Sequence, residues 1–220
     1  MTDNINYEHI VDYLNQTLPK SHGLLGELED YAEKHLTPII QKEVRCLLDS
    51  ILTYKKPTRI LEVGTAIGYS AIFFAMHTDD DGEVITLERD ADYIERAKNN
   101  ISKSDVSHKI KIIEGDAVDT ITSVDGEFDL IFLDANKSKY RYYFDVMFPK
   151  LKEGGLLICD NILYKGMVSN DYLLPRKHNT IVRALRDFLP FLANHPQLST
   201  SIIPIGDGVT ISVKRTKTEE

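Results

Sequence analysis

Apolar positions change their spacing near residue 58, and the change separates two kinds of predicted structure. Before that point apolar residues recur at helical spacing, as in Ile10, Tyr13 and Leu14, and residues 1–55 hold no convincing strand. After it, short apolar runs alternate with longer amphipathic segments. We therefore predict helices over residues 1–55 and an alternation of strands and helices beyond them.

Short apolar runs predict the strands of a sheet. They are Arg59–Val63, Glu83–Leu87, Lys109–Ile113, Phe128–Leu133, Leu156–Cys159, Ser201–Pro204 and Val209–Val213. The predicted helices between them are Ser70–His77, Ala91–Lys103, Ala117–Ser123, Lys139–Leu151 and Asn179–Leu192. This alternation indicates βαβ units, and therefore an α/β fold with a mostly parallel seven-stranded sheet. The turn Gly206-Asp207-Gly208 predicts a hairpin and an antiparallel last strand.

Composition narrows the picture mainly by exclusion. The chain has 220 residues and a formal net charge of −8, which disfavours a globally basic nucleic-acid binder. No run approaches about 18 consecutive apolar residues, so no membrane span is predicted. The two cysteines form no metal or redox motif, and the N-terminus lacks the features of a signal peptide, so we expect a cytoplasmic protein. We expect one domain over residues 1–220, with residues 1–55 as a helical cap and residues 56–220 as the core.

A turn with two glycines follows the first predicted strand. Residues 62–70 read E-V-G-T-A-I-G-Y-S, and Gly64 and Gly68 permit a sharp turn and a close approach of the backbone to a ligand. Ala66 replaces the middle glycine of the dinucleotide motif G-x-G-x-x-G, so the ligand need not be a pyrophosphate. Taken alone, the turn is also compatible with a tight connection that binds nothing.

Two further turns extend the candidate ligand site. Glu88 closes the second strand 24 residues after Gly64, a spacing at which an acidic side chain meets ribose hydroxyls. Asp116 and Ala117 follow the third strand, where small residues would let an adenine ring lie flat. Because the carboxyl ends of parallel strands share one edge of the sheet, these turns predict a nucleoside-binding crevice. A surface acid is the alternative interpretation of Glu88.

Oxygen-bearing side chains follow the next two strands. Asp134 ends the fourth strand, and Asp160 and Asn161 end the fifth. Each one alone is more often a cap or turn residue, but together they form a donor set that suits Mg²⁺. Lys137 stands three residues after Asp134 and is a candidate general base or orienting donor, with a solvated helix-end lysine as the alternative.

These motifs together resemble the cation-dependent O-methyltransferases that use S-adenosylmethionine, a family that includes catechol and caffeoyl-CoA methyltransferases. The segments that carry the resemblance are residues 62–70, 87–88, 134–137 and 160–161, and it spans nearly the whole chain. It implies a Rossmann-like class I methyltransferase fold and a homodimer. Residues 194–196 and 202–208 look like a bacterial branch of the family that methylates 5-hydroxyuridine in tRNA.

The resemblance also implies roles for individual residues. The implied contacts to S-adenosylmethionine are Ile40, Glu62, Gly64, Ser70, Glu88, Asp116, Ala117 and Asp134. The implied ligands of Mg²⁺ or another divalent cation are Asp134, Asp160 and Asn161, and the implied catalytic residue is Lys137. Asn136 departs from the pattern of the catechol enzymes, which have an aromatic residue there, and this disfavours a catechol-shaped pocket.

The expected reaction is methyl transfer to a hydroxyl held on the cation, and the acceptor is implied by the resemblance to the bacterial branch, with local charge as support. Residues 136–143 interleave basic residues with tyrosines, and residues 163–190 carry a local charge of +3, a pattern that suits phosphates and a splayed-out base. The predicted phosphate contacts are Lys139, Arg141, Arg176, Lys177, Arg183 and Arg186. Together with the resemblance, this pattern leads us to expect a tRNA anticodon loop, with 5-hydroxyuridine at the wobble position converted to 5-methoxyuridine; a solvated helix face is the alternative interpretation of the basic residues.

Three other functions fit parts of the sequence. A small catechol or hydroxycinnamoyl compound is the alternative acceptor, and the acidic net charge favours it. A nicotinamide dehydrogenase is disfavoured by Ala66 and by the predicted metal ligands. A non-catalytic adenosine-binding module would leave those metal ligands without a purpose.

Overall fold

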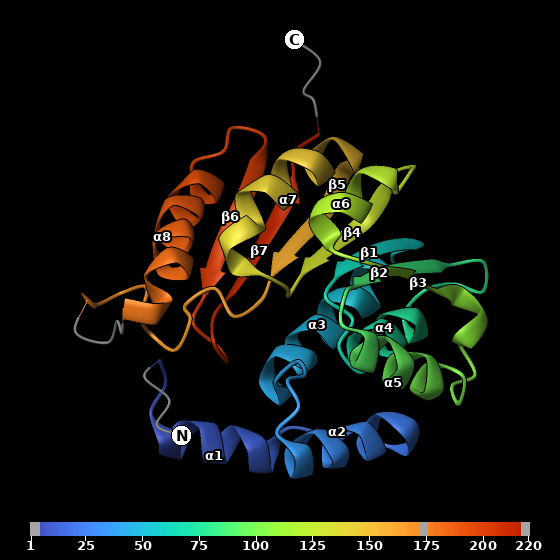
Figure 1. The fold of residues 1–220 in the computed structure, drawn as a ribbon. Helices are drawn as coiled ribbons and strands as arrows, with labels where there is room; N and C mark the ends of the chain where they lie inside the picture. Colours follow the sequence, from blue (N-terminus) through green and yellow to red (C-terminus); the bar gives the residue numbers. More distant parts are fainter. Residues whose placement is uncertain (1–4, 172–175, 217–220) are drawn as a thin grey trace. The chain divides into compact units, whose positions relative to one another are not determined.

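The computed structural model describes residues 5–171 and 176–216, and these residues form an α/β fold. Its seven described strands follow the order β3-β2-β1-β4-β5-β7-β6 (Figure 1). The predicted class, a mostly parallel sheet with an antiparallel last strand and helices, is confirmed. Contacts group the chain into two units, residues 15–124 and a unit made of residues up to 14 and from 125 onward. The single domain over residues 1–220 stays a prediction.

The unit of residues 15–124 contains two N-terminal helices and the first three strands. Its elements are α2 (Gly23–His35), α3 (Lys42–Lys55), β1 (Arg59–Val63), α4 (Tyr69–Met76), β2 (Glu83–Glu88), α5 (Ala91–Ile101), β3 (Ile110–Glu114) and α6 (Ala117–Thr120). β2 pairs in parallel with both β1 and β3. In Figure 1, α3, α4 and α5 lie together on one side of these strands.

Burial explains why these segments fold as they do. β1 and β2 are almost continuously buried, which is typical of parallel strands covered on both faces, and Glu62 and Thr86 are polar residues within this buried region. α4 is apolar all round and contacts both β2 and α2. α5 begins after Asp90, whose side chain accepts hydrogen bonds from the amides of Asp92 and Tyr93 and so caps the helix. The sheet of this unit is therefore a rigid support for the turns at its strand ends.

The other unit contains the remaining four described strands, and α1 (Glu8–Thr17) begins in it. Its further elements are β4 (Phe128–Leu133), η3 (Lys137–Lys139), α7 (Tyr140–Met147), η4 (Phe148–Lys150), β5 (Leu151–Cys159), η6 (Arg176–His178), α8 (Asn179–Ala193), β6 (Leu198–Ile203) and β7 (Val209–Lys214). β5 pairs in parallel with β4 and antiparallel with β7, and β6 pairs antiparallel with β7. α7 and α8 pack against each other on one face of these strands (Figure 1).

Several predicted elements are wrong in extent, and two of them differ most. The helix predicted over Lys139–Leu151 ends as an α-helix at Met147, because Pro149 cannot donate to a helix and a 3₁₀ turn leads into the next strand. That strand begins at Leu151 instead of Leu156, and its register against β4 is irregular. Its first half contains polar residues and glycines, so the apolar pattern alone does not reveal it.

The N-terminal helices are confirmed within the described residues. α2 and α3 bury one apolar face, whereas α1 has no buried side chain. None of the helices in the described ranges combines the length and the apolar content that a membrane crossing requires. Of the three described helices before β1, α2 and α3 bury side chains, and the helical cap over residues 1–55 stays a prediction.

Candidate functional site

The turn after β1 is held in an unusual backbone conformation. Gly64 has a φ of 105° and Ala66 a φ of 45°, so two of its residues are left-handed. The amide of Ala66 donates to Glu88 Oε2 at 3.0 Å. At Gly68, which has a φ of 84°, an added Cβ would lie 3.3 Å from Ile101 of α5. The two glycines predicted from the sequence are therefore required by geometry, and the turn lies directly beside the end of β2.

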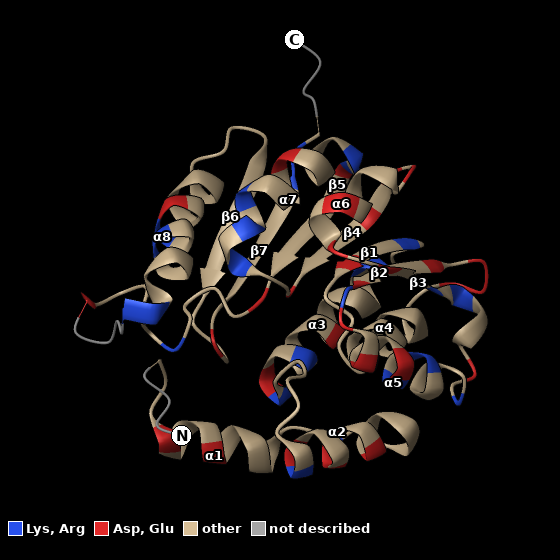
Figure 2. Cartoon of the chain, in the orientation of Figure 1, with Lys and Arg blue, Asp and Glu red and all other residues tan. Residues whose placement is uncertain are grey.

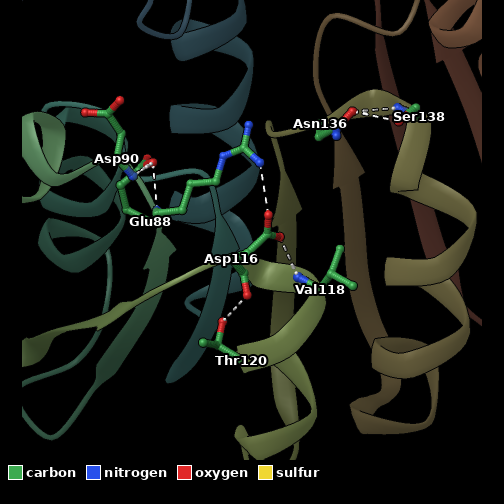
Figure 3. Close-up of polar contacts among 8 residues, drawn as sticks. Glu88, Asp90, Asp116, Val118, Thr120, Asn136 and Ser138 are labelled. Carbon is green, nitrogen blue, oxygen red and sulfur yellow. Dashed lines mark hydrogen bonds and ion pairs between the residues drawn. The ribbon is translucent and has the colours of Figure 1, made fainter.

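Glu88 is half-buried at the end of β2 and accepts three backbone hydrogen bonds. Oε2 accepts from Ala66, and Oε1 accepts from the amides of Arg89 at 2.9 Å and Asp90 at 3.0 Å (Figure 3). A carboxylate has about four lone-pair sites, so acceptor capacity remains after these contacts. The structure thus fixes the orientation of the side chain that was predicted to bind ribose.

Asp116 caps α6, the short helix after β3. Its side chain accepts from the amide of Val118 at 3.0 Å (Figure 3). It also pairs with Arg89 at 2.9 Å. Its carbonyl oxygen accepts from the Thr120 hydroxyl at 3.0 Å, and the neighbouring Ala117 is buried. Asp116 therefore has a structural role at this turn, and its contact to a cofactor stays a prediction.

Glu62, another predicted cofactor residue, is buried in a polar chain inside the sheet. Its Oε2 accepts from the Thr86 hydroxyl at 2.5 Å, and the hydroxyls of Thr86 and Thr65 lie 2.6 Å apart. This chain joins β1, β2 and the turn, and the sequence reasoning missed its two threonines. A sequence signal was available, because Glu62 and Thr86 are polar residues between apolar residues of β1 and β2. Ser70 and Ile40, which were also predicted to contact the cofactor, are buried in the same unit.

The predicted metal ligands lie in the other unit, at the ends of β4 and β5. Leu133 and Cys159 are register partners in these parallel strands, and Asp134 and Asp160 are the residues that follow them. The amide of Asp160 donates to the Leu133 carbonyl at 2.9 Å. The buried Tyr140 hydroxyl donates to the carbonyl oxygens of Leu133 and Asp160, at 3.0 and 3.2 Å. The structure therefore brings the two aspartates to neighbouring positions and fixes both strand ends.

Burial makes the charge of Asp160 unfavourable. Its exposed fraction is 1%, and one of its oxygens accepts from the amide of Asn161 at 2.7 Å. Burial and the negative charge of Asp134 raise the pKa of Asp160 to about 8, whereas the Asn161 amide and Lys137 lower it. Lys137 Nζ lies 3.1 Å from Asp134 Oδ1, so one ammonium offsets one of two carboxylates. The remaining negative charge and the oxygen donors fit a divalent cation.

Local backbone geometry positions the other members of this group. Asn161 is left-handed, with a φ of 54°. Asn136 accepts from the amide and hydroxyl of Ser138 at 3.2 and 2.8 Å (Figure 3) and so caps the turn that carries Lys137. Within the described ranges, no three His, Cys, Asp or Glu side chains are arranged to hold a metal ion. A cation here would therefore depend on two carboxylates, the side-chain amide oxygen of Asn161 and further oxygens from water or substrate.

The predicted phosphate contacts fall into two groups. Arg186 donates to the carbonyls of Val168 and Met167 and pairs with Asp171, and Arg141 pairs with Asp145 while lying over an aromatic ring. These two side chains therefore serve the structure of their own unit. Lys139, Arg176, Lys177 and Arg183 are exposed, and so is Arg141 despite its ion pair. The basic residues of η6 and α8 are coloured blue in Figure 2.

Known proteins resemble this chain over most of its length. The sequence model of the O-methyltransferase family matches residues 16–215. A caffeoyl-CoA O-methyltransferase of Populus kitakamiensis is 29% identical and covers 93% of this chain and 92% of its own. A Staphylococcus aureus structure, provisionally described as a caffeoyl-CoA O-methyltransferase, is 32% identical with a TM-score of 0.84, covering 94% of this chain and 98% of its own. An SAH-bound Podospora anserina methyltransferase is 27% identical with a TM-score of 0.84, covering 95% of each chain. All the predicted site residues lie within the matched range.

Proposed function

The chain belongs to the O-methyltransferase family, and we propose that it transfers a methyl group from S-adenosylmethionine to a small acceptor with two adjacent oxygens, with the help of a divalent cation. The observation that carries the proposal is the pair of neighbouring carboxylates at the ends of β4 and β5, Asp134 and the buried Asp160. Lys137 offsets the charge of Asp134, and a cation would offset the cost of ionising the buried Asp160.

The unit of residues 15–124 supports binding of S-adenosylmethionine. Glu88 is held by three amides and keeps acceptor capacity for ribose hydroxyls. Ser70 lies in the first turn of α4, where free amides favour a carboxylate such as that of the methionine part. Gly64 allows the backbone to approach a ligand closely. The related Podospora anserina structure holds SAH, the demethylated form of this donor.

Residues of the other unit would hold the cation and the acceptor. Asp134, Asp160 and Asn161 supply hard oxygen donors, which are the ligands that Mg²⁺ prefers. When bound, a divalent cation lowers the pKa of an acceptor hydroxyl and orients adjacent oxygens. Lys137 is tethered to Asp134, so its Nζ has a defined place from which to orient that hydroxyl as an ammonium, or to accept the hydroxyl's proton once the amine has lost its own.

A small acceptor is better supported than tRNA. Two relatives are described as caffeoyl-CoA O-methyltransferases, one of them provisionally, and that substrate class carries adjacent aromatic hydroxyls. The net charge of −8 opposes a polyanion, and Arg141 and Arg186 are engaged within their own unit. The anticodon loop is the second candidate, and the exposed Arg176 and Lys177 are what favour it.

An acceptor comparison tests the proposal. Purified protein, S-adenosylmethionine and Mg²⁺ are combined in three separate reactions, each with one acceptor. The acceptors are free catechol, a hydroxycinnamoyl thioester and tRNA that carries 5-hydroxyuridine. Mass spectrometry of each product is expected to show a single added methyl group on a small acceptor. Methylation of the tRNA alone would establish the second candidate in its place. Absence of methylation from every acceptor would contradict the proposed function.

A further inference from the structure

We propose that Glu29 and Tyr69 are positioning residues for the turn after β1, a role that rests on the proposed function because that turn would bind the cofactor. The Tyr69 hydroxyl donates to Glu29 Oε1 at 2.5 Å. Tyr69 is the first residue of α4, between Gly68 of the turn and Ser70. Glu29 lies in α2, so the contact joins the N-terminal helices to the turn.

The Glu29 carboxylate also contacts two other side chains of the same unit. The Ser21 hydroxyl donates to it at 2.6 Å, and Arg45 Nε of α3 lies 3.4 Å away. Arg45 is 7% exposed and donates to the Pro19 carbonyl at 2.7 Å. Hydrogen bonds to an ionised group are strong where water is excluded. One carboxylate therefore joins α2, α3, the segment before α2 and the start of α4.

The Tyr69 side chain is buried, and its hydroxyl is a hydrogen-bond donor. Its exposed fraction is 2%. Burial and the hydrogen bond to Glu29 raise the pKa of Tyr69 well above its usual value, so the hydroxyl keeps its proton. The ring cannot swing away from the core without losing this bond, and the first turn of α4 is attached to it. The bond therefore restrains the backbone on both sides, at Gly68 and at Ser70.

The other anchors of the turn come from different elements. Ala66 is held by Glu88 of β2, and the Ile67 carbonyl accepts from Asn100 of α5 at 2.9 Å. The Tyr69–Glu29 bond adds an anchor from the N-terminal helices. Ile40, a predicted cofactor contact, lies on the connection between α2 and α3, the two helices that Glu29 and Arg45 join. The same cluster thus restrains two segments that were predicted to bind the cofactor.

This arrangement acts on cofactor affinity and leaves the chemical step unchanged. The apparent dissociation constant rises in inverse proportion to the fraction of molecules whose site is already in the binding conformation. Loss of the bond lowers that fraction. Once the cofactor is bound, the turn is held by the cofactor itself, so turnover at saturating cofactor is preserved.

Tyr69→Phe tests the bond, and Tyr31→Phe is its matched control. Tyr31 also lies in α2, but its hydroxyl bonds Arg96 of α5 and not the turn. Calorimetry is expected to show an approximately tenfold higher Kd for S-adenosylmethionine in Tyr69→Phe, with kcat at saturation changed less than about twofold. Tyr31→Phe leaves both unchanged. Glu29→Gln raises the Kd in the same way, and the double variant with Tyr69→Phe adds little, because both changes remove one interaction.

Amide hydrogen exchange without cofactor reads out the turn directly. Residues 64–70 are expected to exchange faster in Tyr69→Phe and in Glu29→Gln than in the wild type, and at the wild-type rate in Tyr31→Phe. Unchanged exchange in both of the first two variants, or equal effects from the control, would overturn the positioning role. Failure of the wild type to bind S-adenosylmethionine would instead contradict the proposed function, and the exchange comparison would still decide the role of Glu29 and Tyr69.

Discussion

Among single residues, Glu88 combines a structural and a proposed binding task. It accepts three backbone hydrogen bonds at the end of β2 and would also accept from ribose. Glu88→Ala is expected to weaken S-adenosylmethionine binding by about 1.5–3 kcal/mol, roughly a 10- to 100-fold rise in Kd by calorimetry. Glu114 is its register partner on β3 and pairs with Lys98 at the surface, so Glu114→Ala is the control. Equal affinity in Glu88→Ala and the control would refute the assignment.

If Asp160 is a metal ligand, the free energy of unfolding is expected to rise when Mg²⁺ binds. If Mg²⁺ binds the folded chain, a concentration about 100 times its Kd stabilises the fold by about 2.7 kcal/mol, which raises Tm by about 5–10 °C in a protein of this size. Asp160→Asn is expected to abolish most of this rise. Thermal melts with EDTA and with Mg²⁺ measure it, and Asp119→Asn, at an exposed position of α6, serves as the control. The site is refuted if Asp160→Asn responds to Mg²⁺ like the wild type.

The raised pKa of Asp160 predicts that the stability of the fold depends on pH when no metal is present. Burial and Asp134 raise the pKa of Asp160 to about 8, above the value of about 3.9 for an unfolded aspartate. The unfolded chain therefore releases the proton first, and the stability contribution falls as pH rises from about 4 to 8. In EDTA, Tm is expected to fall more between pH 6 and pH 8 in the wild type than in Asp160→Asn, and thermal melts at the two pH values measure this difference. Identical losses would mean that Asp160 does not titrate in this range.

At the scale of elements, α8 holds the segment that follows β5. Arg186 donates to the carbonyls of Met167 and Val168 and pairs with Asp171. Arg186→Met is expected to lower stability by about 1–2 kcal/mol, or Tm by about 2–8 °C, since these partners lose a charged donor. Arg183→Met, on the exposed face of the same helix, should change stability by less than about 0.5 kcal/mol. Equal effects in the two variants would show that Arg186 is only a surface charge.

The end of α8 packs His195 into an aromatic cluster with α7. His195 contacts the rings of Phe144, Phe148 and Phe191, and its Nδ1 accepts from the amide of Gln197 at 3.3 Å. Burial and the charge of Arg141 lower its pKa, so the unfolded chain binds a proton more readily. Stability is therefore expected to fall as pH drops below about 6.5, and His195→Gln is expected to reduce that slope in acid melts. An unchanged slope would contradict the lowered pKa.

Local patterns predicted the elements well and tertiary contacts poorly. The apolar run of β4 and the left-handed glycines of the first turn are properties of neighbouring residues, so the sequence revealed them. The first half of β5 did not match a strand pattern because it contains polar residues and glycines, and its register against β4 shifts there. The Glu29–Tyr69 bond joins residues 40 positions apart, and only the folded packing of α2 on α4 reveals it.

At the scale of the whole molecule, the family match covers every predicted site residue, and the net charge bears on the proposed acceptor. Family similarity covers residues 16–215, which include all the predicted site residues. A chain with a formal net charge of −8 repels a polyanion at long range, and this favours a small acceptor. The homodimer implied by the resemblance and the cytoplasmic location stay predictions.

Methyl transfer in the presence and absence of metal tests the central claim most directly. Purified protein, S-adenosylmethionine and the small acceptor are combined in EDTA, and Mg²⁺ is then added in excess. We expect no methylated product in EDTA and full activity after the addition. In the same assay Asp160→Asn is expected to stay inactive with Mg²⁺ while it still binds S-adenosylmethionine. Turnover in EDTA equal to that with Mg²⁺, or wild-type turnover in Asp160→Asn, would contradict the account.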